Sequence, residues 1–249
     1  MMKWVHSGSI ALLALAIATG AAPGFVPTAR ASTSEAGHPK RADFRNVAVS
    51  QGVQHIAEWA VHSGDHKGLP FIVVDKLNAT AVAFDGNGRL LRATSVLIGM
   101  GVGDTFEPGV LQMDMYATKP HQRITPAGRF FADEDRNDKG ERVLWVDYDA
   151  GIALHKLSPK RTKQQRHTRI ASPDPAQHRI TYGCINVPPA FYDQVVHPNF
   201  RTKGGFVYVL PDSAPVKAVF KSYDVVERRL SAAEHAGPAG AGSNKTQRF

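Results

Sequence analysis

The chain has 249 residues and a mass of 27.0 kDa, with 43% hydrophobic and 21% charged residues. This composition supports one sizeable hydrophobic core and excludes a disordered, fibrous or multi-span membrane protein. Lys and Arg outnumber Asp and Glu by 30 to 22, and the net charge of +8 favours an acidic partner, such as a wall polymer, a nucleic acid or an anionic membrane. The single cysteine excludes an intramolecular disulfide, a Cys-rich zinc motif and a CxxC redox pair.

The first 31 residues have the pattern of a secretory signal peptide. Lys3 precedes an apolar run over residues 10–18, and a segment with Gly and Pro leads to Ala31. The run is shorter than the roughly 20 residues that cross a bilayer, so we expect no stable membrane span after cleavage. Cleavage after Ala31 would place the protein in the periplasm or cell envelope; a retained N-terminal anchor is the alternative.

A leader and one helix are predicted before the main domain. Residues 32–42 lack apolar periodicity, which is typical of a flexible leader. Apolar residues then recur at a spacing of three to four and predict an amphipathic helix over residues 46–62. Asp43 or Asn46 is the expected N-cap, and Gly64 follows the end of the helix. We assign residues 32–68 to this leader and helix.

Short β-branched and aromatic runs predict strands through the rest of the chain. They cover residues 71–74, 80–84, 89–98, 128–132, 143–148, 152–157 and 206–210, with turn chemistry at residues 85–88. One short helix is predicted over residues 189–196, because Pro is favourable at the first helical position. The pattern predicts a mainly β, mixed α+β domain over residues 69–211, with few short helices. Residues 212–249 form an extension whose Gly- and Ala-rich end, 236–249, we expect to be disordered.

The only cysteine lies in a segment suited to nucleophilic chemistry. Cys184 follows Gly183 and comes just before the predicted helix at Pro189. A thiol near a helix N-terminus has a lowered pKa, and glycine lets backbone N–H groups approach an oxyanion. A buried structural cysteine is the alternative interpretation.

A thiol nucleophile needs a base, and His155 is the leading candidate. It ends the strand-like run 151–154, and strand ends are where catalytic groups reach a cleft. His155 would take the proton of Cys184 and later protonate a leaving amine, while its other ring nitrogen needs a fixed acceptor. Asp147, Asp149 or a backbone carbonyl could be that acceptor.

These segments together resemble the L,D-transpeptidase (YkuD-type) catalytic domain of bacterial cell-wall enzymes. That family has a His at a strand end, followed by a Ser/Thr-His-Gly-Cys-apolar-Arg/Asn signature. His155 matches the first feature, and the second is matched by Thr181, Gly183, Cys184, Ile185 and Asn186. Residues 125–130 look like the family's Thr-Pro-x-Gly-x-Phe strand entry. The resemblance covers about residues 69–211 and implies the family's β-sandwich or barrel-like fold.

The resemblance also implies an activity. In the family, the Cys attacks the carbonyl between an L- and a D-centre of a peptidoglycan stem peptide, expels the terminal D-residue and passes the acyl group to an amine, without metal or cofactor. It assigns Cys184 as nucleophile, His155 as base, the N–H groups of Gly183 and Cys184 as oxyanion donors, and Thr181 and Asn186 as pocket supports. The carbonyl of Lys156 could orient His155, and Arg179 and His178 are further candidates for substrate contacts.

Two departures from the family pattern stand out. Tyr182 replaces the signature's His, so a phenol that is not a cation at neutral pH lies beside the thiol. The loop over residues 156–179 is longer than usual and holds seven basic residues against one acid, Asp174. It could be a lid that binds substrate carboxylates or an ordinary solvated loop.

Other functions remain open on the sequence. The same thiol chemistry with water as acceptor would make an L,D-carboxypeptidase or a hydrolase of wall cross-links or anchors. A secreted wall-binding module without turnover is a second alternative, and a zinc site built from His155, His167, His178 and Cys184 is a third. We expect no nucleic-acid partner, because no helix-turn-helix, zinc finger or aromatic stacking platform is evident. The sequence does not indicate an oligomeric state.

Overall fold

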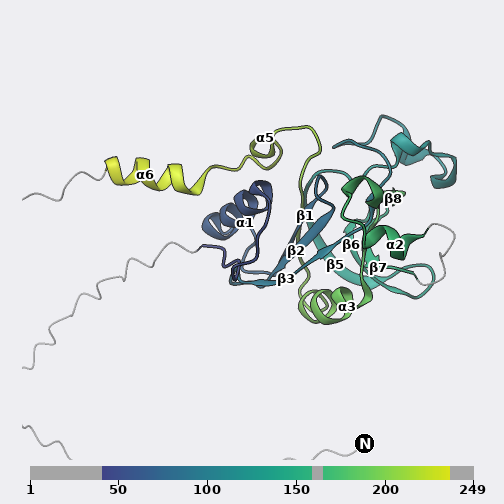
Figure 1. Ribbon diagram of the computed structural model, residues 1–249, viewed down its shortest axis with the longest axis horizontal. Helices are drawn as coiled ribbons and strands as arrows, with labels where there is room; N and C mark the ends of the chain where they lie inside the picture. Colours follow the sequence, from purple (N-terminus) through teal and green to yellow (C-terminus); the bar gives the residue numbers. More distant parts are fainter. Residues whose placement is uncertain (1–40, 159–164, 236–249) are drawn as a thin grey trace, which may run out of the picture. The chain divides into compact units, whose positions relative to one another are not determined.

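The computed structural model describes residues 41–158 and 165–235, which belong to the unit His38–Phe249 (Figure 1). The predicted signal peptide, most of the predicted leader and the predicted tail at 236–249 lie outside the described residues. Most of the regular structure is β, with short helices around it. The predicted mainly β fold class is confirmed.

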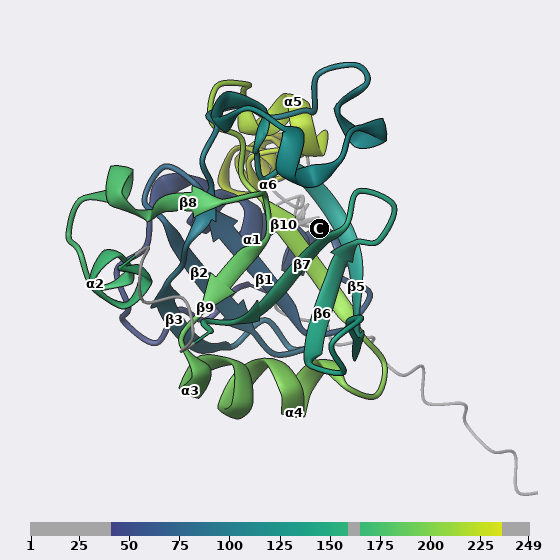
Figure 2. The same cartoon turned by 90° about the vertical axis from the view of Figure 1, so that its right-hand side faces the viewer.

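The main sheet has eight strands in the order β3-β2-β1-β10-β5-β6-β7-β9. The pairs β1–β10 and β7–β9 are parallel, and the other neighbours are antiparallel. The strands are β1 (Phe71–Asp75), β2 (Thr80–Phe84), β3 (Leu90–Ser95), β5 (Gly128–Arg136), β6 (Arg142–Asp147), β7 (Ile152–Lys156), β9 (Ile185–Val187) and β10 (Gly205–Val209). Figure 2 shows the curved sheet, with β2 and β3 on its left side and β5 and β6 on its right side. All seven predicted strands are present.

The two edges of this sheet meet, which gives a barrel-like closure. Just after the edge strand β3, Leu97 bridges Asn186 of the opposite edge strand β9 through two backbone hydrogen bonds of 2.9 and 2.8 Å. The predicted strand 89–98 therefore divides into β3 and β4 (Ile98–Gly99). β4 pairs in parallel with β8 (Arg179–Thr181), the short strand that leads to the cysteine.

Strand alternation builds two hydrophobic clusters, one on each face of the central strands. On β1, Ile72 and Val74 lie in the cluster inside the curved sheet, and Phe71 and Val73 lie in the cluster under the N-terminal helix. All five residues of β1 are buried, which is why this strand reads as a continuous apolar run. The central strands are thus packed on both faces.

The N-terminal helix α1 (Gln51–Ser63) begins later than the sequence predicts. Its N-cap is Ser50, whose hydroxyl accepts a hydrogen bond from the N–H of Val53. The predicted start at residue 46 and the predicted caps Asp43 and Asn46 are wrong, because Asn46 has a φ of 63° and belongs to a turn before the helix. The predicted end is confirmed, since Gly64 is a left-handed C-cap.

The predicted helix at 189–196 is present and continues to residue 200. It is formed by α3 (Pro189–Phe191), the π-helical turn η6 (Tyr192–Val196) and α4 (His197–Phe200), and its apolar side chains join the inner cluster. The remaining helices were not predicted: α2 (Arg166–Ile170), α5 (Val216–Phe220), α6 (Val225–His235) and the 3-10 turns η1 (Val110–Gln112), η2 (Met115–Ala117), η3 (Pro120–Gln122) and η5 (Pro175–His178). Among the described helices, none has the length and apolar character to cross a membrane.

Candidate active site

Cys184 lies in a tight turn between β8 and β9. The turn is closed by Thr181, whose hydroxyl accepts from the N–H of Gly183 at 3.1 Å and donates to the carbonyl of Cys184 at 2.6 Å. Strand β9 separates the cysteine from the helix that starts at Pro189. The expectation that a nearby helix N-terminus acts on the thiol is therefore wrong, because a helix dipole acts only within its first turn.

Gly183 is required by this turn. Its φ is +134°, which residues with a side chain rarely adopt. A Cβ atom there would lie 2.6 Å from the carbonyl oxygen of Ile124 and 2.6 Å from Cδ1 of Ile152. The close approach of two other chain segments thus fixes the glycine. Its N–H, assigned to an oxyanion by the family resemblance, donates to Thr181 in this structure.

His155 comes from β7 and lies opposite Asn186 of β9 in the parallel register. Its Nδ1 is 3.0 Å from the carbonyl oxygen of Lys156, so Nδ1 carries the proton. The side-chain amide of Asn186 donates to Nε2 at 2.9 Å, and its Oδ1 accepts from the buried guanidinium of Arg166. These contacts hold the imidazole in the tautomer whose basic nitrogen is Nε2.

The acceptor at Nδ1 is a backbone carbonyl and not an aspartate. Asp147 accepts instead from the N–H of Ala150, within the turn between β6 and β7. The thiol of Cys184 donates to the carbonyl of Gly151 in the same turn, at 3.6 Å. The β6–β7 connection therefore contacts the thiol of Cys184 directly.

The thiol and the imidazole line one pocket of about 690 Å³. Six of the predicted site residues line it: His155, Lys156, Thr181, Tyr182, Cys184 and Asn186. Among the other lining residues, Met115, Lys139, Arg142 and Arg166 were not predicted from the sequence. Arg166 was only one of the seven basic residues of the long loop, and its short helix α2 gives no recognisable apolar period. The pocket combines a thiol, an imidazole, several cationic side chains and the carboxylates of Glu141 and Asp193.

Two predicted substrate contacts lie elsewhere. Arg179 forms an ion pair with Asp212 at 2.6 Å and donates to the carbonyl of Gly101. His178 is buried, and its ring nitrogens contact the carbonyls of Val96 and Ser172 at 2.8 and 3.0 Å. Neither side chain lines the pocket. Within residues 41–158 and 165–235 no three His, Cys, Asp or Glu side chains are grouped to hold a metal ion, so the zinc alternative gains no support.

Tyr182, which replaces the signature's His, is held by aromatic and cationic contacts. The guanidinium of Arg123 lies 4.0 Å from its ring centroid, and the ring of Tyr116 meets it edge-on at 5.9 Å. Both partners come from the segment over residues 110–123, which also supplies Met115 to the pocket. In this segment the apolar residues 111, 113, 115 and 116 are exposed.

Comparisons with known proteins give structural matches only; no protein-family model and no curated protein matches the chain. An L,D-transpeptidase from Xylanimonas cellulosilytica is 16% identical over 57% of this chain and 60% of that one, with a TM-score of 0.38. The catalytic domain of E. faecium L,D-transpeptidase is 19% identical over 56% of this chain and 95% of that one, at 0.34. The helical cell shape determining protein Pgp2 from Campylobacter jejuni is 14% identical over 59% of this chain and 49% of that one, at 0.38.

The chain spans 60% of the Xylanimonas structure and about half of the Campylobacter structure. The solved structures that it matches are mostly L,D-transpeptidase catalytic domains.

Proposed function

We propose that the chain is an exported cysteine acyltransferase that acts as an L,D-transpeptidase on peptidoglycan stem peptides. The observation that carries the proposal is the shared pocket, in which Cys184 lies with a histidine whose tautomer is fixed by Lys156 and Asn186. The family resemblance of residues 155 and 181–186 names the substrate, and the signal-peptide pattern of residues 1–31 supports export.

The mechanism follows from the fixed tautomer. Nε2 of His155 accepts the thiol proton of Cys184, and the thiol takes the place of the Asn186 amide at that nitrogen. The thiolate attacks the carbonyl carbon, and the tetrahedral oxyanion collapses to a thioester when the leaving amine takes the proton back from Nε2. An acceptor amine then attacks the thioester and gives its proton to the same nitrogen, and the thiolate is released. The carbonyl of Lys156 holds Nδ1–H throughout.

The charges of the pocket fit a substrate with carboxylates. Lys139 and Arg142 line the pocket together with the carboxylates of Glu141 and Asp193, and no ion pair of Lys139 or Arg142 is found among the described residues. Lys156, in contrast, pairs with Asp193 at 2.9 Å. An anionic stem peptide would give Lys139 and Arg142 charge-assisted hydrogen bonds near the thiol.

The test is mass spectrometry after incubation with a disaccharide-tetrapeptide muropeptide and an amine acceptor. Wild-type protein should release the terminal D-residue and form a new amide. Cys184→Ala and His155→Gln should reduce the rate by at least about 10³-fold, because a nucleophile and its base act as a unit. Lys203→Met, an exposed change, is the matched control. Release with water added would identify a carboxypeptidase, and no reaction by the wild type would favour a non-catalytic wall-binding module.

A further inference from the structure

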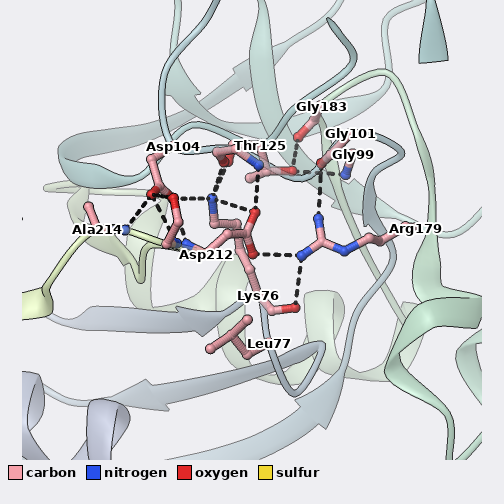
Figure 3. Close-up of polar contacts among 12 residues, drawn as sticks. Lys76, Leu77, Gly99, Gly101, Asp104, Thr125, Arg179, Gly183, Asp212 and Ala214 are labelled. Atoms are coloured by element: carbon pink, nitrogen blue, oxygen red, sulfur yellow. Dashed lines mark hydrogen bonds and ion pairs between the residues drawn. The ribbon is translucent and has the colours of Figure 1, made fainter. Parts of the chain in front are cut away.

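A second threonine holds the cysteine turn from the interior of the protein. Thr125 is 1% exposed, and its hydroxyl donates to the carbonyl of Gly183 at 2.7 Å. The same oxygen accepts from the N–H of Gly99 at 2.9 Å, so both its donor and an acceptor position are used. Figure 3 shows these two hydrogen bonds, from Thr125 to Gly183 and from Gly99 to Thr125. The hydroxyl therefore fixes the direction of one particular peptide bond, the one between Gly183 and Cys184.

The direction of that peptide bond decides where the N–H of Cys184 points. The described residues contain no cis peptide bond, and in a trans peptide the C=O and N–H groups point in opposite directions. Because the carbonyl of Gly183 points at buried Thr125, the N–H of Cys184 points away from the interior. Cys184 itself lines the pocket. The oxyanion formed when its thiolate attacks a carbonyl develops on that side.

The position of Thr125 is fixed in turn by a buried group of charges. The ammonium of Lys76 donates to the backbone carbonyl of Thr125 at 3.0 Å, and its side chain is 0% exposed. It also lies 3.1 Å from Asp104 and 3.2 Å from Asp212. Asp212 pairs with Arg179 at 2.6 Å, so two cations face two carboxylates (Figure 3). We call Lys76, Asp104, Arg179 and Asp212 the buried charge cluster.

We propose that Thr125 is a positioning residue for acyl transfer: its hydroxyl orients the Gly183–Cys184 peptide so that the N–H of Cys184 meets the oxyanion. The inference rests on the proposed function only in that Cys184 accepts an acyl group. Thr125 does not contact the substrate. It differs from Thr181, which closes the turn from the pocket side.

The experiment compares two reactions of the same thiol. With 4-nitrophenyl acetate, the thiolate attacks the ester carbonyl, an oxyanion forms, the C–O bond breaks and 4-nitrophenolate leaves, so a thioester remains on Cys184. With iodoacetamide, the thiolate displaces iodide from an sp³ carbon and no oxyanion forms. Both rates are read by mass spectrometry of the Cys184 peptide in the folded, full-length protein. A positioning role for Thr125 affects the first reaction alone.

Thr125→Val keeps the shape and removes the hydroxyl. We expect it to slow acylation about 10- to 100-fold, less than the 10²–10³ seen when an oxyanion donor is removed outright, because the N–H is misdirected and not lost. Alkylation should stay within about twofold of the wild type, since it needs no oxyanion donor. Thr125→Ser, which restores the hydroxyl, should recover acylation to within about threefold. Thr80→Val, at the start of β2 and outside the pocket, is the control for a Thr-to-Val change elsewhere in the protein.

Three results would overturn the inference. The first is a parallel fall of acylation and alkylation in Thr125→Val, which indicates general damage to the thiol site. The second is acylation of Thr125→Val at the wild-type rate. The third is a wild-type thiol whose ratio of acylation to alkylation is no higher than that of cysteine in solution. A protein that passes these tests and leaves muropeptides unchanged would contradict the proposed substrate and leave the role of Thr125 standing.

Discussion

Replacing Lys76 with Met should strongly destabilise the protein, although the new side chain is apolar and of similar length. The ammonium donates to two backbone carbonyls, of Gly103 at 2.6 Å and Thr125 at 3.0 Å, and lies between the carboxylates of Asp104 and Asp212. Met can satisfy none of these groups. The substitution leaves two carboxylates against the single cation Arg179 in a buried site.

The size of the stability loss depends on which hydrogen bonds and ion pairs the two carboxylates keep in Lys76→Met. Asp212 keeps Arg179 and the N–H of Gly103, and Asp104 keeps three backbone N–H groups of residues 212–214. We therefore expect the loss found for one partner of a buried ion pair, about 3–5 kcal/mol. For a domain of this size, about 2–4 °C is lost per kcal/mol, so the melting temperature should fall by about 6–20 °C.

Thermal and urea unfolding at pH 7, followed by circular dichroism, measure this loss. Lys203→Met is the matched control and should change the free energy of unfolding by less than about 0.5 kcal/mol, because Lys203 is exposed. The double variant Lys76→Met/Asp212→Asn should be more stable than the sum of its single changes by about 1–3 kcal/mol, since it removes opposite charges together. Additive effects, or a loss from Lys76→Met below about 1 kcal/mol, would refute the assignment of Lys76 as the central cation.

Two further predictions concern the turn and the acid stability. Gly183→Ala should lower the free energy of unfolding by about 1–3 kcal/mol, because alanine is strained at a φ of +134°. The clash of its Cβ atom with the Ile124 carbonyl should also slow acyl transfer. An unchanged melting temperature and an unchanged rate would contradict this prediction. Burial acts to raise the pKa of Asp104, but hydrogen bonds from the N–H groups of residues 212–214 and from Lys76 outweigh it and hold that pKa well below its usual range. Its folded pKa is below its unfolded value of about 3.9, so its contribution to stability is complete above that pH and is lost as the pH falls toward the folded pKa. Urea unfolding at pH 7 and about pH 3 should show this loss, and Asp104→Asn should show less of it; equal losses would argue against Asp104 as a source of the pH dependence.

The strands could be predicted from sequence because each is either a continuous run of apolar residues, buried on both faces, or a run in which apolar and polar residues alternate. The caps could not, because Asp43, Asn46 and Ser50 are all good N-cap types and only the tertiary fold selects Ser50. The strands β8 and β9 were missed for a related reason. Each has three residues, and each is stabilised by pairing with a strand that is distant in sequence, β4 and β7.

Some residues of the candidate site could likewise be predicted from the sequence, and others could not. Cys184 and His155 stand out in the sequence because thiols and imidazoles carry chemistry, and the structure places them in one pocket. The roles of Arg166 and Thr125 depend on contacts across 20 and 58 residues, to Asn186 and Gly183, and no local pattern signals such contacts. Cys184 is not next to a helix N-terminus, because the three-residue strand β9, too short to recognise in the sequence, lies between them.

The buried charge cluster joins stability to the geometry of the cysteine turn. An apolar group in place of Lys76 would leave the carbonyls of Gly103 and Thr125 without their donor, so the cluster is the way this fold satisfies backbone groups brought inside by the close approach of three loops. Since Thr125 also holds Gly183, displacement of its backbone should reach the peptide bond before Cys184. Lys76→Met should therefore lower both stability and the ratio of acylation to alkylation, whereas Thr125→Val should act mainly on the ratio. If Lys76→Met lowers stability and leaves that ratio unchanged, the cluster supports the loops alone, and the orientation of the cysteine turn depends on the threonine hydroxyl without it.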